Sequence, residues 1–218
     1  MMKLNEDKIL TMLANGTKED IKQYILEQIK LNSCSSSTEK QQIKHFISMA
    51  KKFKKANKDS ISSFAGAFIQ DEFINICDGY RLISFKDTSI VCDMVDEGLK
   101  LIEADKIYLT DQSKAIEITL DIDDIMAFYK LYKARDKSIN LQKKNSLENP
   151  SHYIIRDENQ EILTTINIEY LHDMIKIFNV EDCKILYTGK ASPLFFIDQA
   201  TGNKGLVLPI RFVEYDIK

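Results

Sequence analysis

The sequence predicts an α+β fold built from repeated strand–helix–strand–strand–strand units, with antiparallel sheets, helices on one face and additional helices at the N-terminus. Three observations predict it. Apolar residues recur at helical spacing through residues 5–57, and beyond them in short alternating runs bounded by turn residues. A helix followed by three strand-like runs occurs twice, within 39–85 and within 169–213. A strand leading directly into a helix also occurs twice, within 116–136 and 163–178.

Two short amphipathic helices are expected within residues 5–31. Asn15-Gly16-Thr17 separates them, and Thr17 is a candidate N-cap for the second helix. The residues expected on the inner faces are Ile9, Leu10 and Leu13 in the first helix, and Ile21, Tyr24, Ile25, Gln28 and Ile29 in the second. The Ser-rich stretch 32–38 is a candidate linker. We therefore predict an N-terminal helical segment over 1–36.

A longer helix is expected at 39–57, and its lysines gather on one face. At about 100° per residue they fall within an arc of about 60°. These lysines are Lys40, Lys44, Lys51, Lys55 and Lys58. Phe46, Met49, Ala50, Phe53 and Ala56 lie on the opposite face. The pattern predicts a helix that packs on one side and presents positive charge on the other.

Strands and further helices follow. Three strand-like runs at 62–70, 72–77 and 80–85 predict an antiparallel meander with a turn at Asp78-Gly79. Within 87–113 only Ile107 to Leu109 is strand-like, and the rest is left unassigned. Beyond it we expect strands at 116–120, 163–168, 184–188, 194–197 and 205–213, and helices at 121–136 and 169–178. The predicted domains are 37–145 and 146–218.

Composition places the chain among globular proteins. It has 218 residues, 44% of them hydrophobic and 29% charged, with a net charge of -3. That charge argues against a protein that coats nucleic acid with its whole surface, so any DNA contact needs a separate basic face. No run of about 18 apolar residues and no signal-peptide pattern occur, which predicts a cytoplasmic protein without membrane contact. The four cysteines, Cys34, Cys77, Cys92 and Cys183, lack metal or dithiol spacing.

No motif predicts an enzyme. His45, His152 and His172 are scattered, and Gly189-Lys190-Ala191-Ser192 lacks the upstream glycine of a phosphate loop. Two acidic clusters could hold a divalent cation, Asp121, Asp123 and Asp124 in one and Asp93, Asp96 and Glu97 in the other. The favoured interpretations are a helix N-terminus for the first and a solvated loop for the second. We predict no catalytic residue, no metal and no cofactor.

Two sets of segments resemble one family. The order and spacing of Ile168–Leu171, Cys183–Thr188 and Leu206–Phe212 are similar to the end of the bacterial DNA polymerase III beta subunit, the DNA sliding clamp. The segment Cys77-Asp78-Gly79-Tyr80-Arg81-Leu82 resembles the Thr-Asp-Gly/Ser-His-Arg-Leu hairpin of that family. The resemblance implies a DNA-clamp-like version of the predicted fold. Tyr80 departs from the usual His, and Cys77 from the usual Thr.

The resemblance also implies a peptide-binding cleft. In bacterial clamps this hairpin and the C-terminal strand receive short motifs of DNA polymerases and repair proteins. One wall would consist of Cys77, Gly79, Tyr80, Arg81 and Leu82, and the other of Leu206, Leu208, Pro209, Ile210 and Arg211. The departures at Tyr80 and Cys77 bear on peptide preference more than on fold. The alternative is that the C-terminal segment is only a closing strand, and Pro209, which has no N–H, suits an edge position.

A sliding clamp contacts DNA phosphates without reading bases. The lysine face of 39–57 suits that task, and Lys130, Lys133 and Arg135 would extend it from a second helix. A bacterial clamp subunit has three domains, whereas residues 37–218 have room for two, so a shortened homo-oligomer or a form without a ring is implied. We predict a clamp-like processivity or recruitment factor that binds double-stranded DNA non-specifically. Two alternatives stay open: a solvated lysine face, and a clamp-derived interaction or regulatory module that does not encircle DNA.

Overall fold

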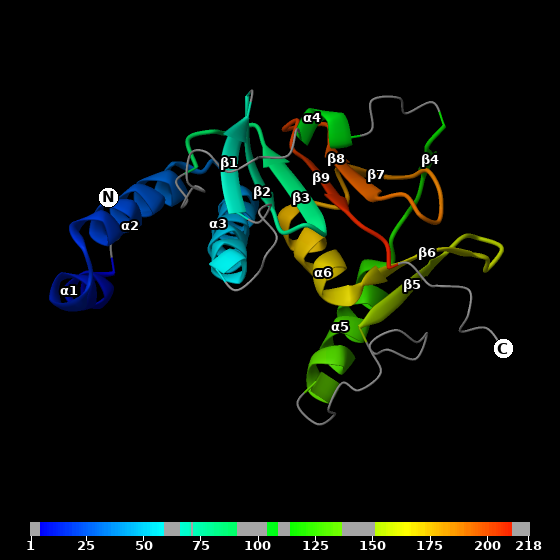
Figure 1. The fold of residues 1–218 in the computed structure, drawn as a ribbon, viewed down its shortest axis with the longest axis horizontal. Coiled ribbons are helices and arrows are strands. Elements are labelled where there is room, and N and C mark those ends of the chain that lie inside the picture. The colour runs from blue at the N-terminus through cyan, green and yellow to red at the C-terminus, as the bar shows by residue number, and fades with distance from the viewer. Residues whose placement is uncertain are drawn as a thin grey trace. The chain divides into compact units, whose positions relative to one another are not determined.

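The computed structural model describes residues 5–58, 66–70, 72–90, 104–108, 114–136 and 151–210, without the side chains of residues 6, 54–58, 105–106 and 135–136. The chain forms two compact units (Figure 1). The first comprises Met1–Gly79 and Ser84–Glu103, and the second comprises Tyr80–Ile83 and Ala104–Lys218. The domain boundaries near residues 36 and 145 stay a prediction.

Three helices begin the first unit. They are α1 (Glu6–Asn15), α2 (Lys18–Ser33) and α3 (Ser37–Lys58). The two N-terminal helices and their separation are as predicted, and α3 matches the long helix expected at 39–57. The expected apolar faces are wrong in part, because Leu10, Leu13 and Ile29 are exposed. The linker expected at 32–38 is shorter, because α2 continues to Ser33 and α3 already begins at Ser37.

Thr17 is the N-cap of α2, as its sequence position predicts. Its side chain accepts a hydrogen bond from Asp20 N at 3.2 Å, and its own backbone N–H donates to Asp20 Oδ2 at 2.8 Å. This reciprocal capping box satisfies two backbone groups that have no partner inside the helix. The hydrogen bonds from Thr17 also hold the pKa of Asp20 below its usual value.

The strands of the first unit are β1 (Gly66–Gln70), β2 (Phe73–Cys77) and the end of β3 (Arg81–Phe85). β1 and β2 are antiparallel, with Gly66 opposite Cys77. α3 packs on β1 and β2 and buries Phe46 and Phe53, and the Phe46 ring lies 4.5 Å from that of Phe85 (Figure 1). The strand expected at 62–70 therefore begins at Gly66 within the described residues.

Three helices and two sheets lie in the described part of the second unit. Its elements are α4 (Ala104–Ile107), β4 (Ile116–Glu117), α5 (Ile122–Asp136), β5 (His152–Arg156), β6 (Ile162–Asn167), α6 (Ile168–Ile177), β7 (Cys183–Tyr187), β8 (Leu194–Asp198) and β9 (Lys204–Val207). One sheet has the strand order β3-β9-β8-β7-β4, and β5 and β6 form the other, an antiparallel pair. β7, β8 and β9 are antiparallel neighbours. The α+β class with antiparallel sheets is confirmed.

The core of this unit lies under α6. Leu171, Met174 and Ile177 of α6 are fully buried, and α6 packs on β6 and β9. β9 can approach this closely because residue 205 is glycine. A Cβ on Gly205 would lie 2.5 Å from Met174 Cε and 2.7 Å from a ring carbon of Phe178.

Three of the predicted strands are wrong in part. In place of the strand expected at 107–109, α4 extends to Ile107 and Tyr108 follows it. The Tyr108 ring is buried, and its hydroxyl can donate to Leu82 O at 3.3 Å or to Lys204 O at 3.2 Å. The strand expected at 116–120 ends at Glu117. The strand expected at 205–213 ends at Val207. Beyond it the backbone has no single neighbouring strand, because Leu208 N donates to Tyr80 O, just before β3, and Ile210 N donates to Thr165 O of β6. β5 was not predicted at all, since His152 to Arg156 shows no clean alternation of buried and exposed residues.

None of the helices in the described part of the chain is long and apolar enough to cross a lipid bilayer.

Candidate peptide and DNA sites

The first wall of the predicted peptide site starts in the turn after β2. Gly79 has a φ of +85°, which lies in the left-handed region that favours glycine. Its N–H donates to Cys77 Sγ at 3.4 Å, and the Cys77 side chain is buried. Both residues belong to the first unit, and they fix the turn that precedes Tyr80.

Tyr80 and Arg81 differ sharply in exposure, although they are adjacent in sequence. Tyr80 is 57% exposed and Arg81 is 2% exposed. The Arg81 guanidinium lies 2.5 Å from Asp173 Oδ2 and 4.1 Å from the centre of the Tyr170 ring. The Tyr80 ring stacks on Tyr170, with ring centres 5.7 Å apart. Tyr170 therefore supports Arg81 and Tyr80 together, while Leu82 is buried beneath the surface.

The second wall follows β9. Leu206 is buried, whereas Leu208 is 37% exposed and Pro209 and Ile210 are half-buried. The backbone N–H of Leu208 donates to Tyr80 O at 2.9 Å, which joins the two predicted walls directly. We call the exposed and half-buried set Tyr80, Tyr170, Leu208, Pro209 and Ile210 the Tyr80–Leu208 surface. Arg211 lies outside the described residues.

Two residues that complete this site were not among the predicted site residues. Tyr170 and Asp173 are three positions apart on α6, so both face the same side of the helix. Tyr170 belongs to a segment that carries the family resemblance, which was a usable signal. Nothing in the sequence pairs Asp173 with Arg81, because that contact depends on how α6 packs.

The lysine face of α3 is partly occupied. Lys44 is exposed, but Lys40 is half-buried and donates to Asn32 Oδ1 at 3.4 Å. The ammonium of Lys51 lies 2.5 Å from Glu27 Oε1 of α2, as an ion pair outside hydrogen-bond geometry. Lys55 and Lys58 lie in α3, and their side chains are outside the description. Phe46, Met49, Ala50 and Phe53 form the opposite, buried face, as predicted.

The cations of α5 are also not all available. Lys130 is exposed, whereas Lys133 donates to Glu169 and lies over the rings of Tyr129 and Tyr132. The hydrogen bond to Glu169 holds the pKa of Lys133 above its usual value. The side chain of Arg135 is outside the description. Lys130 is thus the one predicted DNA contact of α5 that is both described and exposed.

The acidic residues at the start of α5 have structural partners. Asp121 Oδ1 accepts from Asp124 N at 2.9 Å, and Asp124 Oδ2 accepts from the Tyr153 hydroxyl at 2.7 Å. The helix N-terminus explanation therefore accounts for Asp121, whereas the Asp124 carboxylate has the Tyr153 hydroxyl as its partner. Within the described ranges there is no group of three or more His, Cys, Asp or Glu that could hold a metal, and Asp93, Asp96 and Glu97 fall outside those ranges.

The histidines and cysteines of the described residues are spread over different elements. His172 stacks on Tyr129 with ring centres 3.7 Å apart, and His45 and His152 lie in other elements. Burial raises the pKa of the Cys183 thiol to about 12, so this sulfur is protonated and weakly nucleophilic at neutral pH.

Comparison with known proteins gives a loose structural likeness. No family model and no curated protein matches the chain. It is similar to the DNA polymerase III beta subunit of Thermotoga maritima, with 15% identity over 65% of this chain and 42% of that chain, at a TM-score of 0.36. It is also similar to a putative beta subunit from Eubacterium rectale, with 11% identity over 64% of this chain and 41% of that chain, at a TM-score of 0.32. The beta chain of Streptococcus pneumoniae is 13% identical over 66% of this chain and 43% of that chain, at a TM-score of 0.31.

The chain therefore spans less than half the length of these clamp subunits. At these TM-scores the likeness adds no argument of its own.

Proposed function

We propose that this protein is a sliding-clamp-like recruitment factor that binds short peptide motifs of DNA polymerases or repair proteins at the Tyr80–Leu208 surface. One observation carries the proposal. The two motifs that resemble the clamp family were identified separately and lie far apart in sequence, yet Leu208 N bonds to Tyr80 O at 2.9 Å. A clamp-like peptide site requires these two segments to lie side by side, as this bond places them.

The chemistry of this surface suits an apolar peptide. Tyr80 and Leu208 expose a ring and an aliphatic side chain beside each other, and aromatic anchors contribute strongly to peptide and protein binding. Stacking on Tyr170 restrains the Tyr80 ring before a ligand arrives, which reduces the entropy lost on binding. Arg81 is too buried to meet the ligand, so it acts by supporting Tyr170.

The same proposal includes non-specific contact with duplex DNA through α3. Lys44 and Lys51 carry long exposed cations suited to phosphates, although the whole chain has a net charge of -3. A homo-oligomer, a cytoplasmic location and a role in DNA replication belong to the proposal as well. It describes a binding protein, with no reaction assigned to any residue.

A second function is favoured by a specific observation. Lys51 pairs with Glu27, and Lys133 with Glu169, so two of the lysines predicted to contact phosphates already have anionic partners. A clamp-derived interaction module that does not encircle DNA fits this internal neutralisation. The two functions differ in salt-sensitive DNA binding, which only the first requires.

Peptide binding is tested by fluorescence anisotropy with a labelled peptide that carries the bacterial clamp-binding motif. Leu208→Asp should weaken binding at least tenfold, about 1.4 kcal/mol, because it places a charge on the apolar surface. Leu131→Asp is the matched control, since Leu131 is 61% exposed and lies on α5, which contributes no residue to the surface. Equal affinities for both variants, or no binding by the unaltered protein, would refute the peptide site.

A further inference from the structure

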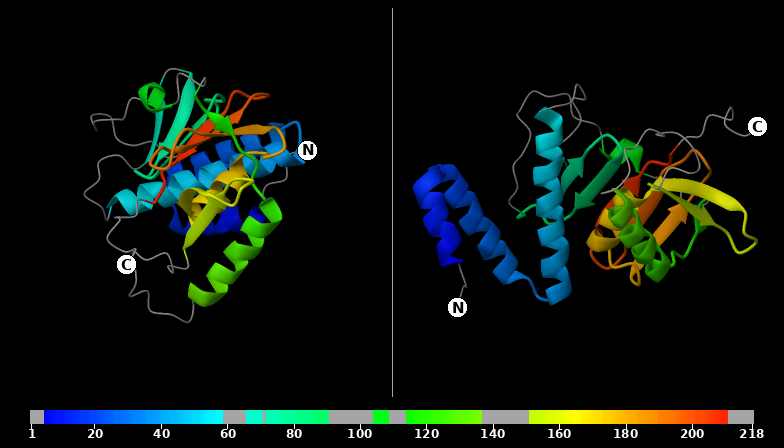
Figure 2. Two further views of the ribbon diagram at one scale, coloured as in Figure 1. Left: turned by 90° about the vertical axis from the view of Figure 1, so that its right-hand side faces the viewer. Right: turned by 90° about the horizontal axis from the view of Figure 1, so that it is seen from below.

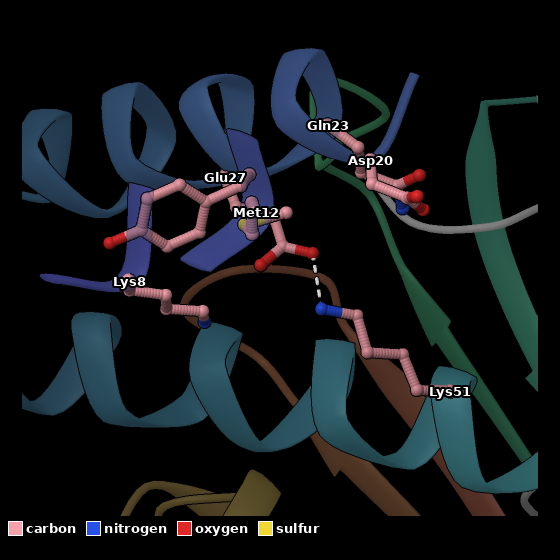
Figure 3. A pocket seen from close by; sticks show the side chains of 7 residues that line it. Lys8, Met12, Asp20, Gln23, Glu27 and Lys51 are labelled. Atoms are coloured by element: carbon pink, nitrogen blue, oxygen red, sulfur yellow. Dashed lines mark ion pairs between the residues drawn. The ribbon is translucent and has the colours of Figure 1, made fainter. Parts of the chain in front are cut away.

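α2 lies against the lysine side of α3, and α1 packs on α2. α2 runs obliquely between α1 and α3 (Figure 2), and the three helices line a pocket of about 230 Å³ that is open to solvent. Lys8 of α1, Tyr24 and Glu27 of α2, and Lys51 of α3 line it (Figure 3). The Lys8 ammonium lies 4.4 Å from the centre of the Tyr24 ring. Charged groups from all three helices thus meet at one place.

The pair of Glu27 and Lys51 is asymmetric. The Glu27 side chain is 9% exposed, whereas that of Lys51 is 48% exposed. Burying a carboxylate is costly unless a cation accompanies it, so Glu27 depends on Lys51 more than Lys51 depends on Glu27. Lys51 retains an open side toward water from which another anion could approach.

The two ends of the α1–α2 hairpin are held differently. At the C-terminal end of α2, Leu31 is buried and Lys30 forms an ion pair with Asp87. At the other end, Leu10 and Leu13 of α1 are 63% and 62% exposed. Local opening is easiest where few apolar side chains are buried. The hairpin is therefore anchored near residue 30 and lightly held at α1, with Glu27 between the two.

A phosphate and the Glu27 carboxylate compete for the same cation. Both present anionic oxygens, and Lys51 cannot neutralise a DNA phosphate while its charge is matched by Glu27 at 2.5 Å. If Lys51 left, Glu27 would be buried without that cation, unless the hairpin moved and let water reach it. Capture of a phosphate by Lys51 is thus linked to movement of the hairpin.

We propose that the α1–α2 hairpin is an internal cover of Lys51 on the lysine face, in which Glu27 takes the place of a DNA phosphate at Lys51. This rests on the proposed DNA contact of α3. The cover lowers the affinity for isolated duplex, and an event that lifts α1 and α2 adds Lys51 to the phosphate contacts. The contact of Glu27 with Lys51 holds the hairpin in place over Lys51, and the ion pair of Lys30 with Asp87 anchors the C-terminal end of α2.

The test measures duplex binding by the full chain over a series of salt concentrations. Glu27→Gln should tighten binding several-fold and steepen the slope of log affinity against log salt by about 0.9, the value for one added phosphate contact. Lys51→Gln should not weaken binding in the unaltered protein. In the Glu27→Gln background it should remove the added slope. Lys44→Gln should weaken binding in both backgrounds, because Lys44 is exposed.

The matched control is Glu19→Gln, which makes the same change in net charge on the same hairpin. Glu19 is 76% exposed and pairs only with the exposed Lys22 among the ion pairs of the described residues. If Glu19→Gln tightened binding as much as Glu27→Gln, net charge would explain the effect and the cover would be refuted. The cover would also be refuted if Lys51→Gln alone weakened binding as much as Lys44→Gln does.

A second measurement does not depend on DNA. Amide hydrogen exchange in α1 and the first turns of α2 should become faster in Glu27→Gln and stay unchanged in Glu19→Gln. Unchanged exchange in Glu27→Gln overturns the cover whatever the binding data show. Faster exchange in a protein that binds no duplex in any variant would instead overturn the proposed DNA contact of α3, and with it the function of the cover.

Discussion

Two ion pairs with the same separation have different surroundings in the two units. Arg81 and Asp173 in the second unit, and Lys51 and Glu27 in the first, each place a cation 2.5 Å from a carboxylate oxygen. The side chain of Arg81 is 2% exposed and lies against Tyr170, whereas that of Lys51 is 48% exposed. Distance alone therefore does not indicate the role of a pair. The buried pair fixes a surface, and the half-exposed pair can exchange its partner.

Loss of Arg81 should have the largest effect. Arg81→Ala leaves Asp173 in a mostly buried position without this cation and removes the guanidinium from Tyr170, so we expect a loss of about 3–5 kcal/mol in the free energy of unfolding. Urea denaturation measures it. Arg156→Ala, in an exposed arginine of β5, should cost less than about 0.5 kcal/mol. Similar losses in the two variants would contradict a structural role for Arg81.

Replacement of the ring beneath Arg81 separates stacking from charge. Tyr170→Leu keeps an apolar side chain but removes the aromatic face that contacts both Arg81 and Tyr80. A desolvated cation–π contact and an aromatic pair together predict a loss of about 2 kcal/mol, with weaker peptide binding. Tyr170→Phe keeps the ring and should retain both properties. A stable Tyr170→Leu protein would show that Arg81 does not depend on the Tyr170 ring.

The half-exposed pair should contribute less. Lys51→Gln leaves Glu27 buried without its cation, but hairpin movement can expose the carboxylate to water, so we expect a loss of only about 1 kcal/mol. Lys22→Gln breaks the fully exposed pair with Glu19 and should cost less than about 0.5 kcal/mol. Thermal denaturation of both variants gives the comparison. A loss for Lys51→Gln as large as that for Arg81→Ala would show that the cover cannot open easily.

The anchor of the hairpin should show the smallest effect, as a dependence on acid pH. Burial opposes ionisation of Asp87, but hydrogen bonds from Lys30 and Ser89 outweigh it and hold its pKa below the usual value. The ionised Asp87 carboxylate stabilises the folded protein above its unfolded pKa of about 3.9. This contribution is lost as the pH falls through its lower pKa in the folded protein. Thermal denaturation of the protein and of Asp87→Asn should therefore differ at pH 7 and converge below about pH 4. A difference that persists in acid would assign the effect to packing.

Local sequence patterns predicted the helices better than the strands. Residues close together in the sequence were enough to predict the break between α1 and α2, the N-cap at Thr17 and the buried face of α3. α4 and β5 could not be predicted in the same way. Tyr108 is held by carbonyls of distant residues, and β5 is stabilised by its pairing with β6. Strand assignments depend on such partners because β-propensity is weak without them.

The candidate site was likewise predicted only in part. The motifs indicated Tyr80, Arg81 and Leu208, but the exposure of Tyr80 and the burial of Arg81 depend on Tyr170 and Asp173 of α6. Helical periodicity placed Lys44 and Lys51 on one face, and it could not show that Glu27 of α2 neutralises Lys51.

Local patterns in the sequence were sufficient to predict the α+β class, the positions of most helices and the two segments that carry Tyr80 and Leu208. These properties depend on residues within a few positions of each other, where backbone geometry fixes which side chains share a face. The availability of charged groups to a ligand could not be predicted in this way. Burial and pairing depend on groups far apart in the chain, and they determine whether a lysine or arginine contacts a ligand or stabilises the protein itself.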